Sequence, residues 1–242
     1  MQGTSHIGSW LPPQGIREIS STQLLPLGTR LQMNGKVFYY AEAGATALAP
    51  GKLMQSPVPA ADHTGLAVTS VAAGQKSLTL TNGASTAFTK NQYRNGELWV
   101  DSGTSVGHGY SIKGNAAAGV NATCVFTLYE ELVELLVNAT DTISLACNPY
   151  ANIIICPSVP TALLLGVTPV DVTGDYFFWL QTWGLCPVLT TDTVVIGNTV
   201  SVADDDDGAV QASDDMVEQV VGTVVRVEAD TEYSLVYLRL AN

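Results

Sequence analysis

One short segment has the spacing of a catalytic serine motif. Residues 103–107 read Gly-Thr-Ser-Val-Gly, which matches G-x-S-x-G, with Asp101 before them and His108 directly after them. A nucleophile elbow places its serine on a sharp turn from a strand into a helix. Residues 107–113 contain two glycines and then alternate like a strand, so the required helix is missing. We therefore predict a glycine-rich hairpin loop and no catalytic residue.

An acidic run suggests calcium at first sight. Residues 204–208 read Asp-Asp-Asp-Asp-Gly. An EF-hand loop needs glycine at its sixth position and glutamate at its twelfth. Here Gly208 comes one position early, and Asp215 occupies the twelfth position. We predict a solvated acidic turn, and weak cation binding by Asp204 to Asp207 is the alternative.

The remaining histidines and cysteines do not form a metal-binding pattern. His6 and His63 have no partners at metal-ligand spacing, and the sequence contains no C-x-x-C pair. A phosphate-binding loop ending in Lys-Ser or Lys-Thr is also missing. We expect no metal and no cofactor, and we expect buried, reduced thiols because a free cysteine usually behaves as a small hydrophobe. The cysteines are Cys124, Cys147, Cys156 and Cys186.

The densest aromatic run is Tyr176-Phe177-Phe178-Trp179, which Trp183 continues. Such a run can form a platform for a carbohydrate ring. Aromatic side chains in a strand are more often core, since each buries about 150 to 250 Å². We therefore predict that this run lies in the core or at a subunit interface.

The local sequence pattern around these residues indicates an all-β protein with few or no helices. Short runs rich in β-branched and aromatic residues end at glycine, Asn-Gly or Asp-Gly, which is the signature of strands and turns. We expect β-sandwich or β-barrel-like units. The predicted strands are 36–42, 77–81, 96–100, 109–113, 123–129, 142–146, 153–156, 175–181, 193–196, 220–227 and 233–240.

One segment also fits a short helix. Leu128, Leu132, Leu135 and Leu136 follow the spacing of one helical face, with glutamates on the other face. Its flanks are rich in β-branched residues. The strand interpretation is favoured, and the helix stays as the alternative.

Composition restricts the class of partner. The 242 residues are 46% hydrophobic and only 13% charged, with a formal net charge of −12. The chain is too apolar for a disordered protein, and its negative field repels phosphate, which disfavours a nucleic-acid partner. No apolar run reaches the roughly 18 residues of a membrane span, and the N-terminus lacks a secretion signal. We therefore expect no membrane partner, and synthesis in a cytosol.

The chain divides into three regions of different texture. Residues 1–60 hold six of the eleven prolines and predict an extended arm with a first hairpin. Residues 61–156 predict a first β-sandwich, and residues 157–242 a second β unit. Prolines favour extended backbone, and an exposed tail has little reason to carry large apolar side chains, so we expect the arm to dock on a neighbouring subunit. Its candidate interface residues are Trp10, Leu11, Pro12, Pro13 and Ile16.

Several stretches together resemble virion proteins of tailed bacteriophages, in particular small capsid decoration or cement proteins. They span most of the chain, and none is a catalytic motif. The stretches are 27–30 (LGTR), 36–44 (KVFYYAEAG), 49–53 (APGKL), 92–93 (QY), 96–101 (GELWVD), 109–113 (GYSIK), 174–181 (GDYFFWLQ), 220–224 (VVGTV) and 233–238 (YSLVYL).

The resemblance implies a β-rich protein, commonly a homotrimer, that binds the outer surface of a phage head and clamps neighbouring major capsid subunits. The protein would be made in the host cytoplasm and located in the virion. Low charge and high apolar content fit a chain that buries much of its surface in such contacts. The chain is longer than the smallest decoration proteins. A tail, collar or fibre structural protein with carbohydrate or receptor binding is the alternative, and a lectin or carbohydrate-active enzyme is a further one.

Overall fold

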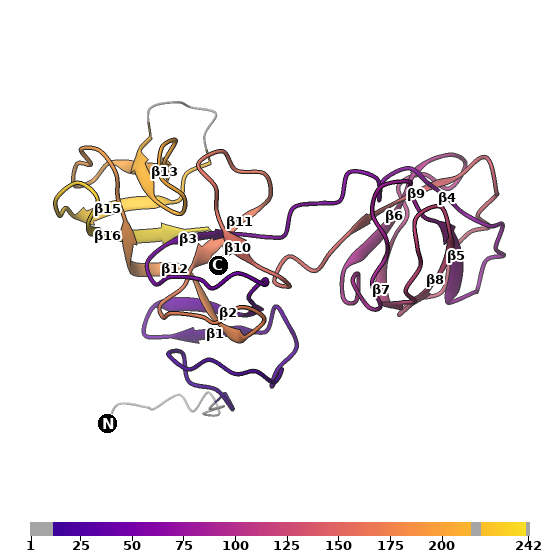
Figure 1. Ribbon diagram of the computed structural model, residues 1–242, viewed down its shortest axis with the longest axis horizontal. Helices are drawn as coiled ribbons and strands as arrows, with labels where there is room; N and C mark the ends of the chain where they lie inside the picture. The colour runs from indigo at the N-terminus through magenta and orange to yellow at the C-terminus, as the bar shows by residue number, and fades with distance from the viewer. Residues whose placement is uncertain (1–11, 214–218, 241–242) are drawn as a thin grey trace, which may run out of the picture. The chain divides into compact units, whose positions relative to one another are not determined.

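The computed structural model describes residues 12–213 and 219–240, which form sixteen strands and no helix. All pairings between named strands are antiparallel. The prediction of an all-β, sandwich- or barrel-like protein is therefore confirmed. The strands group into two compact units, one of residues Ser56–Ala151 and one of the residues on either side of it (Figure 1).

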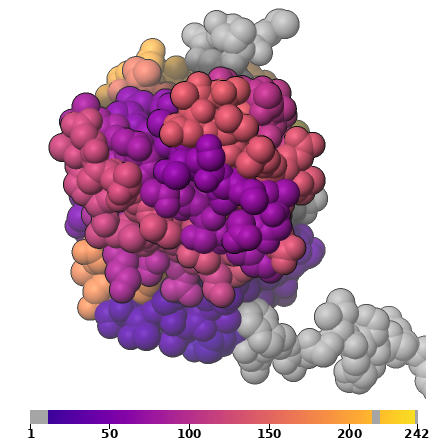
Figure 2. All heavy atoms as spheres, turned by 90° about the vertical axis from the view of Figure 1, so that its right-hand side faces the viewer, coloured from indigo at the N-terminus to yellow at the C-terminus, as the bar shows by residue number. Residues whose placement is uncertain are grey.

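The unit Ser56–Ala151, here called the barrel unit, is a six-stranded sheet with the order β4-β9-β6-β7-β8-β5. A bridge between Val68 and Leu80 joins its two ends, so the barrel is nearly closed. Figure 2 faces this unit and shows early (purple) and late (salmon) segments side by side, as the pairing of β4 with β9 requires. The strands are β4 Leu66–Ala67, β5 Ser77–Thr81, β6 Glu97–Ser102, β7 Gly109–Asn115, β8 Thr123–Leu128 and β9 Thr142–Ala146.

Alternation of side chains builds the core of the barrel unit. Along β8, Cys124, Phe126 and Leu128 are buried while the residues between them are exposed. Successive side chains of a strand point to opposite faces, so this two-residue period lines the interior. Leu98 and Ile112 come from β6 and β7 to the same cluster.

The second unit, here called the β12 unit, is a half-barrel around the long strand β12. The main path of its sheet runs β10-β3-β11-β12-β16-β15-β13-β14, and the β1–β2 hairpin branches from β12. The strands are β1 Arg30–Met33, β2 Lys36–Glu42, β3 Leu53–Gln55, β10 Ile154–Ile155, β11 Leu164–Val167, β12 Phe177–Leu189, β13 Thr199–Val202, β14 Val210–Ala212, β15 Gly222–Arg226 and β16 Tyr233–Arg239.

Strand β12 changes partner midway, and Gly184 makes the change sterically possible. From Phe177 to Trp183 it pairs with β2, and from Trp183 to Leu189 with β16. Gly184 has φ +88°, and a Cβ there would lie 2.6 Å from the carbonyl oxygen of Gly35. Only glycine combines a positive φ with so close a backbone approach.

The barrel unit is inserted into the β12 unit. The chain leaves through β3 and returns through β10, and these strands pair so that Gln55 lies opposite Ile154. The expected division into 1–60, 61–156 and 157–242 treats the regions as consecutive, whereas β2 pairs with β12 and β3 with β11. The first and third regions therefore share one sheet.

Local predictions also differ from the structure. The leucine-rich segment after β8 is neither the favoured strand nor the alternative helix: it is a loop, joined to Val71 by a bridge at Leu136. Its spacing reflects barrel packing, because Leu132 and Leu136 are both buried in the barrel core. The predicted strand 193–196 is wrong. That segment is a loop ending in a turn at Gly197, which has φ +88°.

Candidate functional site: the N-terminal segment on strand β12

Gln14 fastens the N-terminal segment to β12. Its side-chain amide donates hydrogen bonds to the carbonyls of Glu18 (2.7 Å) and Phe177 (2.9 Å). Its side-chain oxygen accepts from the Tyr40 hydroxyl at 2.9 Å, and its backbone carbonyl accepts from the Trp179 indole N–H at 2.9 Å. Gln14 is buried, so these bonds satisfy a polar side chain that would be costly to bury alone.

The predicted interface residues fall in different places. Ile16 is half-buried and packs against the cluster of Phe38, Tyr40, Phe177 and Trp179 in its own chain. Pro12 is half-buried and Pro13 is exposed. Trp10 and Leu11 lie outside the described residues. Ile16 is therefore a contact within the chain, because the hydrogen bonds of Gln14 hold the following turn against β12.

Tyr40 is the second centre of this cluster. Burial raises the pKa of its phenol, and the Leu24 N–H that donates to the phenol oxygen opposes the shift only in part. The ring stacks on Phe177 and meets Trp179 edge-on, with ring centroids 6.1 and 5.2 Å apart. The neutral hydroxyl therefore connects the N-terminal segment to the aromatic core as a structural group.

The G-x-S-x-G segment is a loop between β6 and β7, as predicted, and a strand follows it. The Ser105 hydroxyl donates to the carbonyl of Leu135 and is buried. The Asp141 carboxylate accepts from the backbone N–H groups of Thr104, Ser105 and Val137, which holds the loop. Burial raises the pKa of Asp141, but these donors outweigh burial and leave the pKa below its ordinary value.

The acidic run 204–207 forms an exposed turn before β14. The Asp207 side chain accepts from the Ser158 N–H, and its backbone carbonyl accepts from the Lys52 ammonium group. Over residues 12–213 and 219–240, no group of three His, Cys, Asp or Glu side chains is placed to share a metal ion.

The barrel unit contains a buried polar pair, His63 and Tyr93, that the sequence did not predict. The Nε2 atom of His63 faces the Thr86 carbonyl at 3.1 Å, so it carries the hydrogen, and Nδ1 accepts from the Tyr93 hydroxyl. Both side chains are buried beside Phe88. His63 and Tyr93 are 30 residues apart, and no local pattern predicts their contact.

Most of the predicted aromatic run lies in the core. Phe177, Phe178 and Trp179 are buried, as predicted, whereas Tyr176 and Trp183 are half-buried. Trp99 is instead 37% exposed on the outer face of β6, between Gly109 and Ser144 on the neighbouring strands. Small neighbours leave its ring uncovered.

The cysteines are free, and three of the four are buried. Burial raises the pKa of Cys156 and of Cys186 to about 12, so neither thiol is a nucleophile at neutral pH. Cys147 is half-buried.

We compared the chain with protein families, curated proteins and solved structures, and found no match. No protein-family model, curated protein or solved structure matches the chain at a significant level. In the described part of the chain, no helix has the length and apolarity needed to cross a bilayer.

Proposed function

We propose that this chain is a structural virion protein that binds the outer surface of a phage capsid and stabilises the lattice of the major capsid protein, without enzymatic activity. The resemblance of its sequence to decoration proteins supports the proposal. So does its acidity, which suits the outside of a DNA-filled shell. The residues of the serine motif support it further, because their polar groups are engaged in holding a loop.

The observation that carries the proposal is the free edge of β1. Within residues 12–213 and 219–240, β1 pairs only with β2. Its side chains are exposed or half-buried, including Met33 at 39% exposure, and Ile19 and Leu24 are exposed nearby in the sequence. An edge strand presents unpaired N–H and C=O groups to which a neighbouring chain can add a strand. We assign β1 to contact with a second copy, in a homotrimer, or with the capsid.

The register identifies which N–H groups point outward. The two-residue turn Asn34-Gly35 makes Met33 and Lys36 a hydrogen-bonded pair, so the N–H of Gln32 points away from β2. Gln32→Pro removes that outward donor without breaking the β1–β2 ladder, and Gln32→Ala keeps it. We expect Gln32→Pro to reduce occupancy on heads at least about tenfold, while Gln32→Ala binds as wild type. Equal occupancy of both variants would remove β1 from the interface.

Copy number tests the function itself. Quantitative mass spectrometry of purified virions should find hundreds of copies per particle, in a fixed ratio to the major capsid protein. A small multiple per particle would favour the tail, collar or fibre alternative instead.

The N-terminal arm is tested separately. Trp10→Ala should weaken capsid attachment by about 2 kcal/mol or more if this aromatic side chain is an interface anchor. A deletion must stop at residue 11, since Gln14 belongs to the β12 unit. Undiminished occupancy after deletion of residues 1–11 would show that the arm is not the clamp.

Trp99 favours the second candidate function, a tail or fibre protein that binds carbohydrate. A partly exposed indole ring flanked by Gly109 and Ser144 could offer a surface on which a sugar ring stacks. A glycan array comparing wild type with Trp99→Ala tests this function. Binding that is lost in the variant would support it, and an array without signal would reject it.

A further inference from the structure

A cleft of about 330 Å³ opens in the β12 unit beside β12. This volume is near the lower limit of small-molecule sites, which are commonly about 300 to 1,000 Å³. Two cations, three prolines and one tyrosine form most of its lining. These residues are Arg17, Lys36, Pro50, Pro169, Pro187 and Tyr233.

Separate parts of the fold bring the two cations to this cleft. Arg17 lies in the turn between Gly15 and Glu18, which Gln14 fastens to β12. Lys36 begins β2, and its stem crosses β12 over Gly184, where a Cβ would lie 3.2 Å from the Lys36 Cγ. The same features that anchor the N-terminal segment therefore place positive charge in the cleft.

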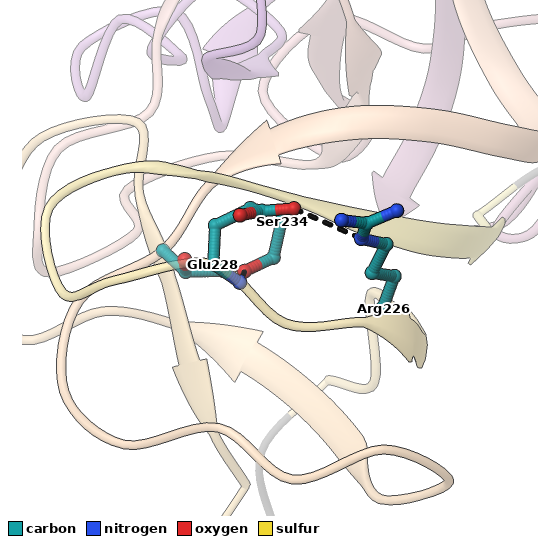
Figure 3. Close-up of polar contacts among 4 residues, drawn as sticks. Arg226, Glu228 and Ser234 are labelled. Atoms are coloured by element: carbon teal, nitrogen blue, oxygen red, sulfur yellow. Dashed lines mark hydrogen bonds and ion pairs between the residues drawn. The ribbon is translucent and has the colours of Figure 1, made fainter.

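The charge of the cleft is unusual for this molecule. The chain has 22 acidic and 10 basic residues, yet none of the acidic side chains in the described part of the chain lines the cleft. Elsewhere in the unit Arg226 pairs with Glu228 at 3.1 Å (Figure 3), and Lys52 donates to the Asp207 carbonyl. Neither Arg17 nor Lys36 has an ion pair among the described residues. Two cations that line one cleft repel each other, and a bound anion would offset that repulsion.

The walls and floor determine what kind of anion fits. The Tyr233 ring lies against Gly51, where a Cβ would be 2.5 Å from the ring, so Gly51 leaves room for the ring at the edge of the cleft. The prolines add rigid apolar surface. On the floor, the Gln181 amide donates to the carbonyls of Trp183 and Leu185. Cys186 also lines the floor, and because its pKa is about 12 it offers no covalent attachment.

We propose that this cleft binds an organic carboxylate with an apolar body the size of one or two amino-acid residues. The carboxylate is held by Arg17 and Lys36, and the apolar body lies against Tyr233 and the prolines. A free organic acid and the C-terminus of a polypeptide share this chemistry. The proposal does not depend on the capsid role, because it concerns the cleft of a single chain.

Titration of the full-length chain with a matched set of probes tests the proposal. The probes are 3-phenylpropionate, its uncharged amide analogue 3-phenylpropionamide, acetate, and the peptide acetyl-Ala-Phe with a free carboxylate. Calorimetry and NMR measure the binding of each probe. We expect 3-phenylpropionate to bind with saturation below about 20 mM. The amide and acetate should each bind at least about tenfold more weakly, because one lacks the charge and the other the apolar body.

Variants locate the site. Arg17→Gln and Lys36→Gln should each weaken 3-phenylpropionate at least about fivefold. The matched control is Arg30→Gln, which removes a cation of the same unit that lies outside the cleft. Tyr233→Ala provides a test that leaves both cations in place, since this side chain is 46% exposed. It should weaken 3-phenylpropionate and leave acetate unchanged.

Each outcome decides the proposal. Equal binding of acid and amide, equal effects of Arg17→Gln and Arg30→Gln, or the absence of saturation would overturn it. Tighter binding of the peptide than of 3-phenylpropionate would support it and assign the ligand to a polypeptide C-terminus. The reverse order would support it and assign the ligand to a free acid.

Discussion

The indole N–H of Trp179 donates a 2.9 Å hydrogen bond to the backbone carbonyl of Gln14, 165 residues earlier in the chain. Trp179 is fully buried, so its N–H depends on this partner. The N-terminal segment therefore completes the core of the β12 unit, and it also places Arg17 beside the cleft.

Gln14→Ala should destabilise the β12 unit by about 2 kcal/mol or more. It removes two donated bonds and the acceptor of the buried Tyr40 hydroxyl, and a buried group left unsatisfied costs about 1 to 3 kcal/mol. Urea unfolding measures the change. Gln23→Ala is the control, because among the described residues the side chain of this exposed glutamine donates only to the nearby Leu25 carbonyl, and its effect should stay within about 0.5 kcal/mol. Similar losses in both variants would contradict the anchoring role of Gln14.

The barrel unit should fold by itself, and the β12 unit should fold without it. The pairing of Gln55 with Ile154 holds the two connection points together, so a Gly-Ser linker of about four residues can replace Ser56–Ala151. Circular dichroism and dispersed NMR spectra of both pieces check this prediction. A disordered spectrum for either piece would show that the units depend on each other.

The barrel unit should lose stability in acid. Burial raises the pKa of Asp141, but several hydrogen-bond donors together outweigh burial and lower the pKa below its ordinary value. A depressed folded pKa contributes stability above the unfolded value of about 3.9, and this stability is lost as the pH falls through the folded pKa. Trp99 is the one tryptophan of this unit, so its ¹⁹F signal in fluorotryptophan-labelled protein can follow unfolding. In a plot of unfolding free energy against pH, Asp141→Asn should reduce the loss of stability at acidic pH. An unchanged loss would exclude Asp141 as its source.

The ionisation of Glu42 should make the β12 unit less stable as the pH rises, which is opposite to the effect of Asp141 in the barrel unit. Burial and then the charge of Asp175 raise its pKa. A raised folded pKa contributes stability that is present below the unfolded value and is lost as the pH rises through the folded pKa. Glu42→Gln should therefore stabilise this unit at pH 7 more than at pH 4, as thermal melts at the two values would measure. A larger gain at pH 4 would contradict this sign.

Ser105→Ala should cost about 1 kcal/mol of barrel stability, since it leaves the Leu135 carbonyl without its hydroxyl donor. Ser102→Ala, at an exposed position, is the control. Chemical denaturation of both variants measures the difference. Loss of an esterase activity in the Ser105 variant would instead revive the catalytic interpretation.

Several strands were predictable from sequence because their information is local. Predicted strands 36–42, 77–81 and 142–146 have the observed bounds, since runs rich in β-branched and aromatic residues end at turn residues there. The predicted strands do not include β1, β3, β4, β11, β13 and β14, each of which spans two to four residues. The place of β3 and β11 in the sheet comes from pairing with each other and, for β11, with β12.

The sequence by itself determined the all-β class and the loop at the G-x-S-x-G segment, because strand periodicity and turn residues act over a few positions. Only the tertiary structure decided that regions one and three form a single sheet, that Ile16 packs against its own core, and that Arg17, Lys36 and Tyr233 line one cleft. The physical reason is that these contacts join residues far apart in the chain, whose pairing depends on burial of the whole unit.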